Sequence, residues 1–437
     1  MRPCTRCASS LLLAALAAAA CGPAPPASEA VARLRALGRP NLVLVVVDAL
    51  RADGIAPYFA PPAASPELAR WAAQGVVFER AFAQSSWTKA SMASLLTSRW
   101  PRGHGVRDPD DGLGGAARTV AEALREAGWR TFAVQSNGWL EEAFGFEQGF
   151  ERYLFPRGGG SESERSRSWP HADNVYREAE RLIDAQDPAQ PFFLYLHFMD
   201  VHEYAAPADV ARPRAGAPGE YAAAIAWVDE VLARLRARLE RRGLLAHSVL
   251  ILASDHAEAF GENGAFGHAR NVFTPVLHVP LVLRLPFASA PARIATQVRN
   301  LDVAPTLLDL AGLPASPDFE GESLLPLLAA PGAPDRPSHA SLETRLYADA
   351  RLQEALNDGD WSYVRDLGPG GREWLFDRRV DPEEDVDLSA LEPQRAAALR
   401  ARLDAGIGRA PAAGAVRPEV RIDPALAERL RALGYAL

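Results

Sequence analysis

The stretch Asn41-Leu42-Val43-Leu44-Val45-Val46-Val47, followed directly by Asp48, decides the fold of this chain. An unbroken run of leucine and valine is typical of a strand that is buried on both faces of a parallel sheet. Similar apolar runs recur along the chain, at residues 131–134, 192–198, 248–253 and 281–285. Helical stretches such as 119–127 and 221–242 separate them. Strands that alternate with helices predict an α/β fold with a mostly parallel central sheet flanked by helices.

Polar residues stand at the carboxyl ends of these predicted strands. Asp48, Asp255 and His256 follow apolar runs, and His202 lies in the loop after another. Open α/β sheets bind ligands beyond the carboxyl ends of their strands. A carboxylate that ends a buried strand is costly unless it is paired or bound to metal. The sequence therefore predicts a binding site at this edge of the sheet.

The alternation of strands and helices loosens beyond about residue 335. The short segments 361–367 and 373–376 predict a small antiparallel sheet and thus a C-terminal α+β subdomain. A helical tail is predicted over 424–433, with Asp423 placed to cap it and Gly434 to end it.

The N-terminal segment has the features of a secretion signal. Two arginines precede a short apolar run over 11–20, which is too short to span a membrane as a mature helix. The run Ala18-Ala19-Ala20-Cys21-Gly22 resembles a bacterial lipobox, which implies cleavage before Cys21 and a lipid on its sulfur. A plain signal peptide with an incidental cysteine is the alternative.

The sequence thus predicts four parts: a signal peptide over residues 1–20, a lipidated tether over 21–40, an α/β domain over 41–334, and a C-terminal subdomain with a helical tail over 335–437. The lipid would hold the protein to a membrane of the bacterial cell envelope, and Gly22 favours the outer membrane. A net charge of −8 gives no electrostatic case for nucleic acid, and the oligomeric state stays open.

One segment bears directly on the chemistry: Ser86-Trp87-Thr88-Lys89-Ala90-Ser91-Met92-Ala93-Ser94-Leu95-Leu96-Thr97-Ser98-Arg99, with His104-Gly105 just beyond. It resembles the signature of the sulfatase family, in the alkaline phosphatase superfamily, where Cys-x-Pro-Ser-Arg leads into a Leu-Thr-Gly-Arg helix and then a His-Gly. In sulfatases that cysteine is oxidised to formylglycine. Here Thr88 stands in its place, and threonine cannot be converted in that way. The chain has only three cysteines, all in the N-terminal segment: Cys4, Cys7 and Cys21.

Two further segments extend the resemblance, which runs from about residue 41 to 388. Residues 47–53 resemble the first metal motif of the family, and residues 254–264 resemble its Ser-Asp-His-Gly-Glu segment. The resemblance implies that one divalent metal ion is bound by four residues: Asp48, Thr88, Asp255 and His256. Three oxygens and one imidazole nitrogen suit Mn²⁺ or Mg²⁺, with Ca²⁺ or Zn²⁺ possible. A Thr88 that merely caps the following helix is the alternative.

The resemblance also assigns catalytic roles to further side chains. His202 would protonate or bind the leaving-group oxygen, and His268 would lie against the anionic oxygens of the substrate. Lys89 would supply a positive charge, or would be an ordinary solvent-exposed lysine. His104 would touch the substrate or support the family helix. His197, inside an apolar run, reads as a hydrogen-bonded core residue.

Three departures from the family pattern concern the reaction. Met92 stands where sulfatases carry an arginine, residues 136–139 replace a Lys-Trp-His segment, and Ala49 replaces a second ligand. Formylglycine expels sulfate through its second hydroxyl, which threonine lacks. A phosphothreonine can instead be displaced in line by water or an alcohol with metal support.

The sequence therefore predicts a sulfatase-like, metal-dependent hydrolase or transferase with Thr88 as nucleophile. Its anionic substrate would be a phosphate, phosphodiester or phosphonate ester. Sulfuric ester hydrolysis by the unmodified threonine and a catalytically silent binding lipoprotein with the same fold are the alternatives.

Overall fold

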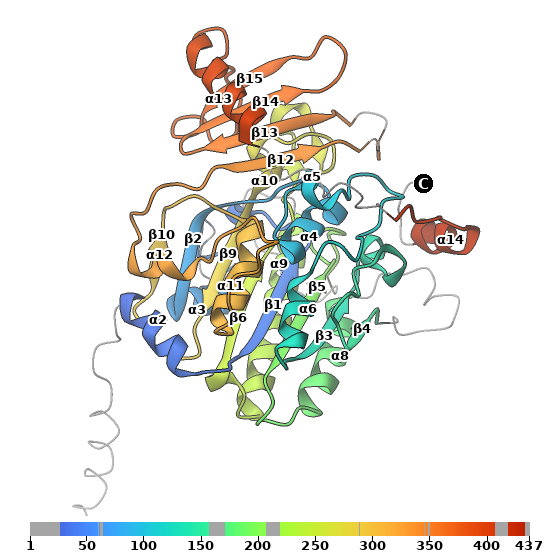
Figure 1. Cartoon of the computed structure of the whole chain (residues 1–437), viewed down its shortest axis with the longest axis vertical. Helices are drawn as coiled ribbons and strands as arrows, with labels where there is room; N and C mark the ends of the chain where they lie inside the picture. Colours follow the sequence, from blue (N-terminus) through green and yellow to red (C-terminus); the bar gives the residue numbers. More distant parts are fainter. Residues whose placement is uncertain are drawn as a thin grey trace, which may run out of the picture.

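A nine-stranded sheet forms the centre of the computed structural model, which describes residues 27–59, 61, 64–156, 171–206, 219–287, 289–344, 346–347, 350–406 and 418–432 (Figure 1). The strand order is β10-β2-β9-β6-β1-β5-β3-β4, and β11 also pairs with β2. The strands are β1 (Asn41–Val47), β2 (Gly75–Phe82), β3 (Arg130–Gln135), β4 (Arg152–Leu154), β5 (Phe192–Phe198), β6 (Ser248–Ala253), β9 (His278–Arg284), β10 (Ala292–Ile294) and β11 (Val298–Arg299).

Most neighbouring strands run parallel, as predicted. β1 lies between β5 and β6 and is parallel to both, and β3 is parallel to β4 and β5. Only β9 runs antiparallel to its neighbours β2 and β6. The predicted α/β fold is therefore confirmed, with one antiparallel strand inside the sheet that the apolar runs did not indicate.

Helices cover both faces of the sheet. They are α2 (Ala27–Ala36), α3 (Pro66–Ala73), α4 (Thr88–Thr97), α5 (Pro101–His104), α6 (Val120–Glu126), α8 (Ala172–Asp184), α9 (Gly219–Arg241), α10 (Thr274–Leu277), α11 (Val303–Leu310) and α12 (Leu325–Ala329). Helices α3, α8 and α9 pack on one face against Val43, Val45 and Val47 of β1. Helices α2, α4, α6, α11 and α12 pack on the other, against Leu42, Leu44 and Val46. Side chains of a strand alternate between faces, so every residue of β1 is buried.

Short elements complete the α/β domain. The 3-10 turns are η1 (Ala52–Gly54), η2 (Gly138–Leu140), η3 (Glu142–Phe144), η4 (Leu245–His247), η5 (Glu262–Gly264) and η6 (Asn300–Asp302). A two-stranded hairpin joins β7 (Ala259–Phe260) to β8 (Phe266–Gly267).

Part of the predicted tether belongs to the folded domain. Residues 27–36 form α2, whose Ala30 and Leu34 are buried in the core. The helix packs beside α12, so at most the part of residues 21–40 before α2 can serve as a tether. Cys21 and the predicted signal peptide lie outside the described residues.

The predicted antiparallel subdomain is present at the C-terminal end of the chain. It has strands β12 (Ser338–Leu342), β13 (Gln353–Asp358), β14 (Trp361–Asp366) and β15 (Glu373–Asp377), covered by α13 (Pro393–Gly406). In Figure 1 this sheet lies above the α/β domain, at the end where α5 and α10 are found.

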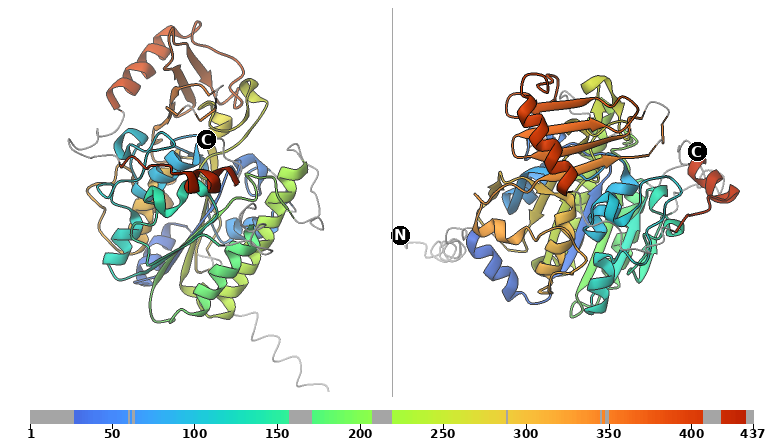
Figure 2. Two further views of the ribbon diagram at one scale, coloured as in Figure 1. Left: turned by 90° about the vertical axis from the view of Figure 1, so that its right-hand side faces the viewer. Right: turned by 45° about the horizontal axis from the view of Figure 1, so that its top comes forward.

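The helical tail α14 (Pro424–Ala432) packs on the α/β domain instead of the subdomain (Figure 2). The Leu426 amide donates to Asp423 Oδ1 at 2.8 Å, which is the predicted cap, while Gly434 lies outside the described residues. Val420 and Gly112 make main-chain hydrogen bonds that tie the start of the tail to the loop at residues 110–112.

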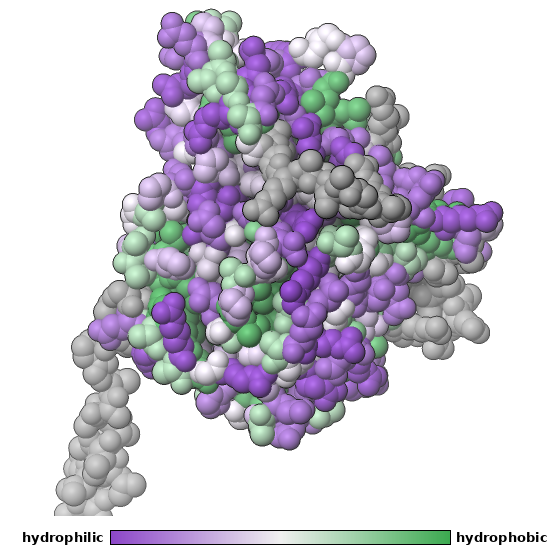
Figure 3. Space-filling view, in the orientation of Figure 1, coloured by the Kyte–Doolittle hydropathy of each residue, from purple (hydrophilic) through white to green (hydrophobic). Residues whose placement is uncertain are grey.

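The face drawn in Figure 3 is mostly hydrophilic, with apolar patches over the helices of the α/β domain. None of the helices described here is long and apolar enough to cross a membrane.

Candidate active site

The carboxyl ends of β1 and β6 meet because these strands are parallel neighbours. Asp48 directly follows β1, and Asp255 and His256 follow β6 after one residue. Two hydrogen bonds join the turns: the Leu50 amide donates to Ser254 Oγ at 3.0 Å, and the Ala49 amide donates to Asp255 Oδ1 at 3.3 Å.

Asp48, Asp255 and His256 form a compact buried triad. Their ligand atoms lie within 4.8 Å of one another, and all three side chains are fully buried. His256 Nε2 is 3.6 Å from Asp48 Oδ1 and 3.4 Å from Asp255 Oδ2. Neither of these two carboxylate oxygens has a hydrogen-bond partner in the described structure. Orphaned, buried carboxylate oxygens that face an imidazole nitrogen fit a divalent cation.

The pKa shifts of the two triad carboxylates also fit a bound cation. Burial raises the pKa of Asp255, and the nearby Asp48 adds to that rise. Burial also opposes ionisation of Asp48, but neighbouring histidines outweigh it and hold the pKa of this carboxyl well below its usual range. These histidines are His202, His197 and His256. One carboxylate is thus held charged beside a second whose charge needs compensation.

His256 has the orientation of a metal ligand. Burial lowers the pKa of its ring, which favours the neutral form at pH 7. Its Nδ1 lies 3.0 Å from the main-chain oxygen of Ala257, so an Nδ1 proton would leave the Nε2 lone pair directed at the triad.

Thr88 joins the triad as the first residue of α4. Its Oγ1 lies 3.4 Å from Asp48 Oδ2 and 3.2 Å from His256 Nε2, and the side chain is 2% exposed. The interpretation of Thr88 as a helix cap is wrong, because Trp87 occupies the N-cap position. Ser91 Oγ donates to the Asp255 main-chain oxygen at 2.5 Å and so fixes the start of the helix against the triad.

His202 and His268 lie together beside the triad. The His268 ring stacks on His256 with centroids 4.4 Å apart, and the His202 ring is 4.7 Å from His268. Both side chains keep partial exposure, at 14% and 11%. His268 Nδ1 is 3.2 Å from Glu258 Oε1, which orients its ring.

The charge of His202 is favoured by its surroundings. Burial works to lower its pKa, but Asp48 and the Glu203 carboxylate, 2.6 Å from Nδ1, raise the pKa to about 9. A protonated His202 with a partly open face is suited to donate a proton to a bound substrate.

Lys89 does not reach the triad, and it is not exposed. Its Nζ donates to the Pro109 main-chain oxygen at 2.7 Å and lies 3.6 Å from the Phe144 ring centroid, in a fully buried position. Burial lowers its pKa well below the ordinary value. The predicted catalytic charge and the predicted surface lysine are both wrong, because the side chain leaves α4 toward an aromatic pocket.

His104 holds α4, the helix that begins with Thr88, to the turn that follows it. Its Nε2 is 3.0 Å from Ser94 Oγ on α4, and its Nδ1 accepts from the Val106 amide at 3.1 Å. These bonds support the second of the two predicted roles, that of a residue that holds the family helix, and contact with the substrate stays a prediction.

Two side chains that the site prediction left out hold Asp48 in place. His197 Nε2 lies 2.9 Å from Asp48 Oδ2, and Asn137 Nδ2 donates to the same oxygen at 2.8 Å. His197 is indeed a hydrogen-bonded core residue, as predicted, but its partner is a proposed metal ligand. The sequence did offer a sign of the role of His197. It is a polar residue inside an apolar run, and the strand formed by that run ends beside Asp48. Asn137 lies in the segment that departs from the sulfatase pattern, and no spacing rule pointed to it.

We expect Asn137→Ala to weaken metal binding by roughly 10- to 100-fold, because side chains that orient metal ligands typically have effects of this size. Isothermal titration of the metal-free protein with Mn²⁺ measures the change. Asn41→Ala is the matched control: Asn41 is a buried asparagine at the opposite end of β1, bonded to Ser248 Oγ. Equal affinities of the Asn137 variant and the wild type would contradict the role given to Asn137.

Comparisons with known proteins agree with this geometry. A sequence model of the sulfatase family matches residues 40–313. Choline-sulfatase of Rhizobium meliloti is 32% identical over 232 residues, which cover 49% of this chain and 42% of that protein. Arylsulfatase K of Mus musculus is 29% identical over 181 residues, which cover 40% of this chain and 32% of that protein. The chain thus spans less than half the length of these two relatives.

Solved structures share the architecture. The phosphonate monoester hydrolase of Agrobacterium radiobacter superposes with a TM-score of 0.69 at 20% identity, over 84% of this chain and 95% of that one. A protein solved with its substrate D-glucosamine-2-N,6-O-disulfate superposes with a TM-score of 0.70 at 17% identity, over 84% and 97%. At these identities the likeness concerns the fold. The family match covers more than half of the chain and includes the triad and Thr88, so this chain belongs to the sulfatase family.

Proposed function

We propose that this protein is a metal-dependent hydrolase or transferase that cleaves phosphate, phosphodiester or phosphonate esters through a covalent Thr88 intermediate. One observation carries the proposal: the Thr88 hydroxyl lies within 3.4 Å of Asp48 and 3.2 Å of His256, at a triad whose orphaned oxygens fit a cation.

Asp48, Asp255, His256 and the Thr88 hydroxyl would hold one divalent ion, with Mn²⁺ or Mg²⁺ favoured and Ca²⁺ or Zn²⁺ possible. Such an ion lowers the pKa of a coordinated hydroxyl and neutralises charge on the group that is transferred. His197 and Asn137 keep Asp48 Oδ2 in a fixed place, so the remaining oxygen of Asp48 faces the triad.

The residues of the chain account for both halves of the reaction. Thr88 Oγ1 gives up its proton to solvent and forms a bond to phosphorus while the bond from phosphorus to the leaving oxygen breaks. His202 gives its Nε2 proton to that oxygen, since Nδ1 is engaged by Glu203. Water or an alcohol then attacks the phosphothreonine in line and gives its proton to Nε2 of the now neutral His202, while the bond from phosphorus to Thr88 Oγ1 breaks and Oγ1 regains a proton from solvent. His268, beside His256, would bind the oxygens that do not react.

The proposed role of His202 predicts a pH dependence. Its raised pKa of about 9 keeps the ring protonated at neutral pH, and the protonated fraction falls as pH rises through that value. A cation beside Asp48 would lower the midpoint. We expect an alkaline limb in kcat/KM with a midpoint at or below about 9, and we expect His202→Gln to abolish it. An unchanged pH profile in His202→Gln would exclude His202 as the proton donor.

The leaving group gives a second test of the same role. Loss of a proton donor slows the release of a poor leaving group more than that of a good one, so His202→Gln should affect alkyl esters more than 4-nitrophenyl esters. A uniform loss over both ester types would indicate a binding role instead.

Sulfate ester hydrolysis is the second candidate, and the names of the curated relatives favour it. The test is an activity panel of 4-nitrophenyl sulfate, 4-nitrophenyl phosphate, bis(4-nitrophenyl) phosphate and 4-nitrophenyl phenylphosphonate, each with Mn²⁺, Mg²⁺, Ca²⁺ or Zn²⁺. The proposal predicts faster turnover of the phosphorus esters. Turnover of the sulfate alone would replace it by the second candidate.

A third possibility is a binding lipoprotein without turnover. Mass spectrometry of the Thr88 peptide after a quench distinguishes it from an enzyme, because a covalent mechanism leaves a phosphoryl or sulfuryl adduct. Absence of both an adduct and turnover across the panel would favour the binding protein.

The proposed location is the bacterial cell envelope, with a lipid on Cys21. Incorporation of labelled palmitate into the full chain, and its loss in Cys21→Ser, tests this anchor. Labelling that survives in Cys21→Ser would rule out Cys21 as the lipidated residue.

A further inference from the structure

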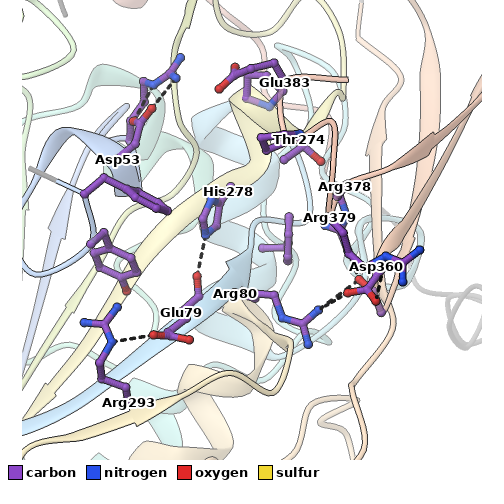
Figure 4. Close-up of a pocket in the computed structure, with 17 residues that line it drawn as sticks. Asp53, Glu79, Arg80, Thr274, His278, Arg293, Asp360, Arg378, Arg379 and Glu383 are labelled. Atoms are coloured by element: carbon purple, nitrogen blue, oxygen red, sulfur yellow. Dashed lines mark hydrogen bonds and ion pairs between the residues drawn. The ribbon is translucent and has the colours of Figure 1, made fainter. Parts of the chain in front are cut away.

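A cavity of about 700 Å³, here called the seam cavity, lies between the α/β domain and the C-terminal sheet (Figure 4). Strands β2 and β9 form one wall, and segments around Asp360 and Arg378 form the other. Neither Thr88 nor any residue of the triad lines this cavity. A cavity of this size is typical of a site for a small organic ligand.

Most of the arginines that line the seam cavity are paired with acidic side chains. Arg80 pairs with Asp335 at 2.6 Å, and Arg293 pairs with Glu79 at 2.6 Å, as Figure 4 shows for the second pair. Arg379 Nη2 lies 2.6 Å from its sequence neighbour Asp377. These paired charges contribute little net attraction for an anion.

Arg378 differs from its neighbours. Its Nη2 donates to Gln297 Oε1 at 2.7 Å and to the Gly359 main-chain oxygen. Its Nε and Nη1 atoms are buried without a hydrogen-bond partner in the part of the chain that the structure describes. Burial lowers its pKa to about 10, which still leaves the guanidinium charged at neutral pH, with Glu384 as the strongest influence in the opposite direction. A buried cation with unused donors is costly unless an anion completes its shell.

Aromatic rings lie next to these free donors. The Phe82 ring is 4.5 Å from the Arg378 guanidinium carbon, and it stacks on the His278 ring with centroids 5.4 Å apart and an interplanar angle of 27°. Tyr58 meets His278 edge-on at 6.4 Å, and Phe59 is 76% exposed at the same cavity. The faces of Phe82 are thus taken by Arg378 and His278, and the exposed ring of Phe59 is the surface that suits a flat, apolar body carrying a negatively charged group.

We propose that the seam cavity binds an organic oxyanion, with a carboxylate, sulfate or phosphate group at the Arg378 guanidinium and a flat body against the exposed ring of Phe59. The ligand is either a distal anionic group of the substrate at the triad or a separate small molecule. Arg51 links the two places: it lines the cavity and donates to the Glu258 main-chain oxygen at 2.8 Å, while the Glu258 carboxylate contacts His268. This proposal does not depend on the reaction at Thr88.

Isothermal titration with naphthalene-2-sulfonate tests the proposal, with the uncharged naphthalene-2-sulfonamide as the matched ligand. We expect Arg378→Gln to weaken sulfonate binding about tenfold or more, which corresponds to ~1.4 kcal/mol. Arg379→Gln removes the same charge from a paired arginine at the same cavity and should change the affinity less than about twofold. The sulfonamide should bind weakly to all three proteins.

Equal sulfonate affinities of the wild type and Arg378→Gln, or equal losses in both variants, would overturn the proposal. A crystal structure of the wild type with the sulfonate keeps the test decisive if Arg378→Gln does not fold: density at Arg378 supports the site, and density elsewhere only, or none, refutes it. Competition with an ester substrate, where turnover is found, assigns the ligand. Competitive inhibition that Arg378→Gln relieves identifies a distal substrate group, and binding without competition identifies a separate molecule.

Discussion

Replacement of Thr88 by valine is expected to lower turnover on the order of a thousandfold or more at saturating metal, since removal of a catalytic nucleophile has effects of that size or larger. Valine keeps the branched shape of threonine and lacks only the hydroxyl that lies near Asp48 and His256. Thr88→Ser restores the hydroxyl and should recover a measurable part of the rate. Initial rates with the best ester of the panel give the comparison.

Thr97→Val is the matched control for this experiment. Thr97 is a buried threonine at the other end of α4, where its Oγ1 donates to the Ala93 main-chain oxygen at 2.6 Å. The same chemical change there should reduce stability by about 1 kcal/mol and leave the catalytic rate nearly unchanged. Equal losses in both variants would mean that damage to α4 causes the effect. Full activity of Thr88→Val would remove Thr88 from the mechanism.

The parts of the fold that follow from the sequence are those with a strong local pattern. Asn41–Val47 and Phe192–Phe198 are predicted to the residue, because a strand buried on both faces needs an almost entirely apolar run. Strand β2 (Gly75–Phe82) escapes the same reading because Glu79 and Arg80 interrupt it, and both form ion pairs. The antiparallel direction of β9 depends on its neighbours in the sheet and has no local signature.

The site residues also divide into those that a local sequence pattern predicts and those that it does not. Asp48, Asp255 and His256 could be predicted because each follows an apolar strand at the edge where parallel strands end. The direction in which a side chain leaves a helix could not be predicted from the sequence. Lys89 and Thr88 are neighbours on α4, yet Thr88 faces the triad and Lys89 faces Phe144. Asn137 reaches Asp48 because β3 and β5 bring residues distant in sequence to one place, which spacing along the chain does not reveal.

Metal removal should reverse the stability order of the wild type and Asp255→Asn. Burial raises the pKa of Asp255, so the folded protein favours its protonated form and ionisation of this carboxyl opposes folding. That cost is absent below the pKa of the unfolded chain, and it grows as pH rises toward the folded value. Asparagine has no charge to bury and can still accept from the Ala49 amide. In EDTA at pH 7, Asp255→Asn should therefore be more stable than the wild type by about 1–3 kcal/mol.

Added metal should make the wild type more stable than Asp255→Asn, because only the wild type keeps the complete ligand set. At a free concentration about 1,000 times its Kd, the ion adds ~4.1 kcal/mol to the stability of the wild type, which exceeds the advantage of Asp255→Asn, and it should restore turnover that EDTA abolishes. Urea unfolding of both proteins, with EDTA and with Mn²⁺, measures the crossover. Asp302→Asn is the control, because Asp302 is equally buried but pairs with Arg299 and Arg336, so its loss should destabilise the protein with or without metal. Equal gains from Mn²⁺ in both proteins would show that Asp255 is not part of a cation site, and a wild type that exceeds Asp255→Asn in EDTA would contradict the cost of burying its charge.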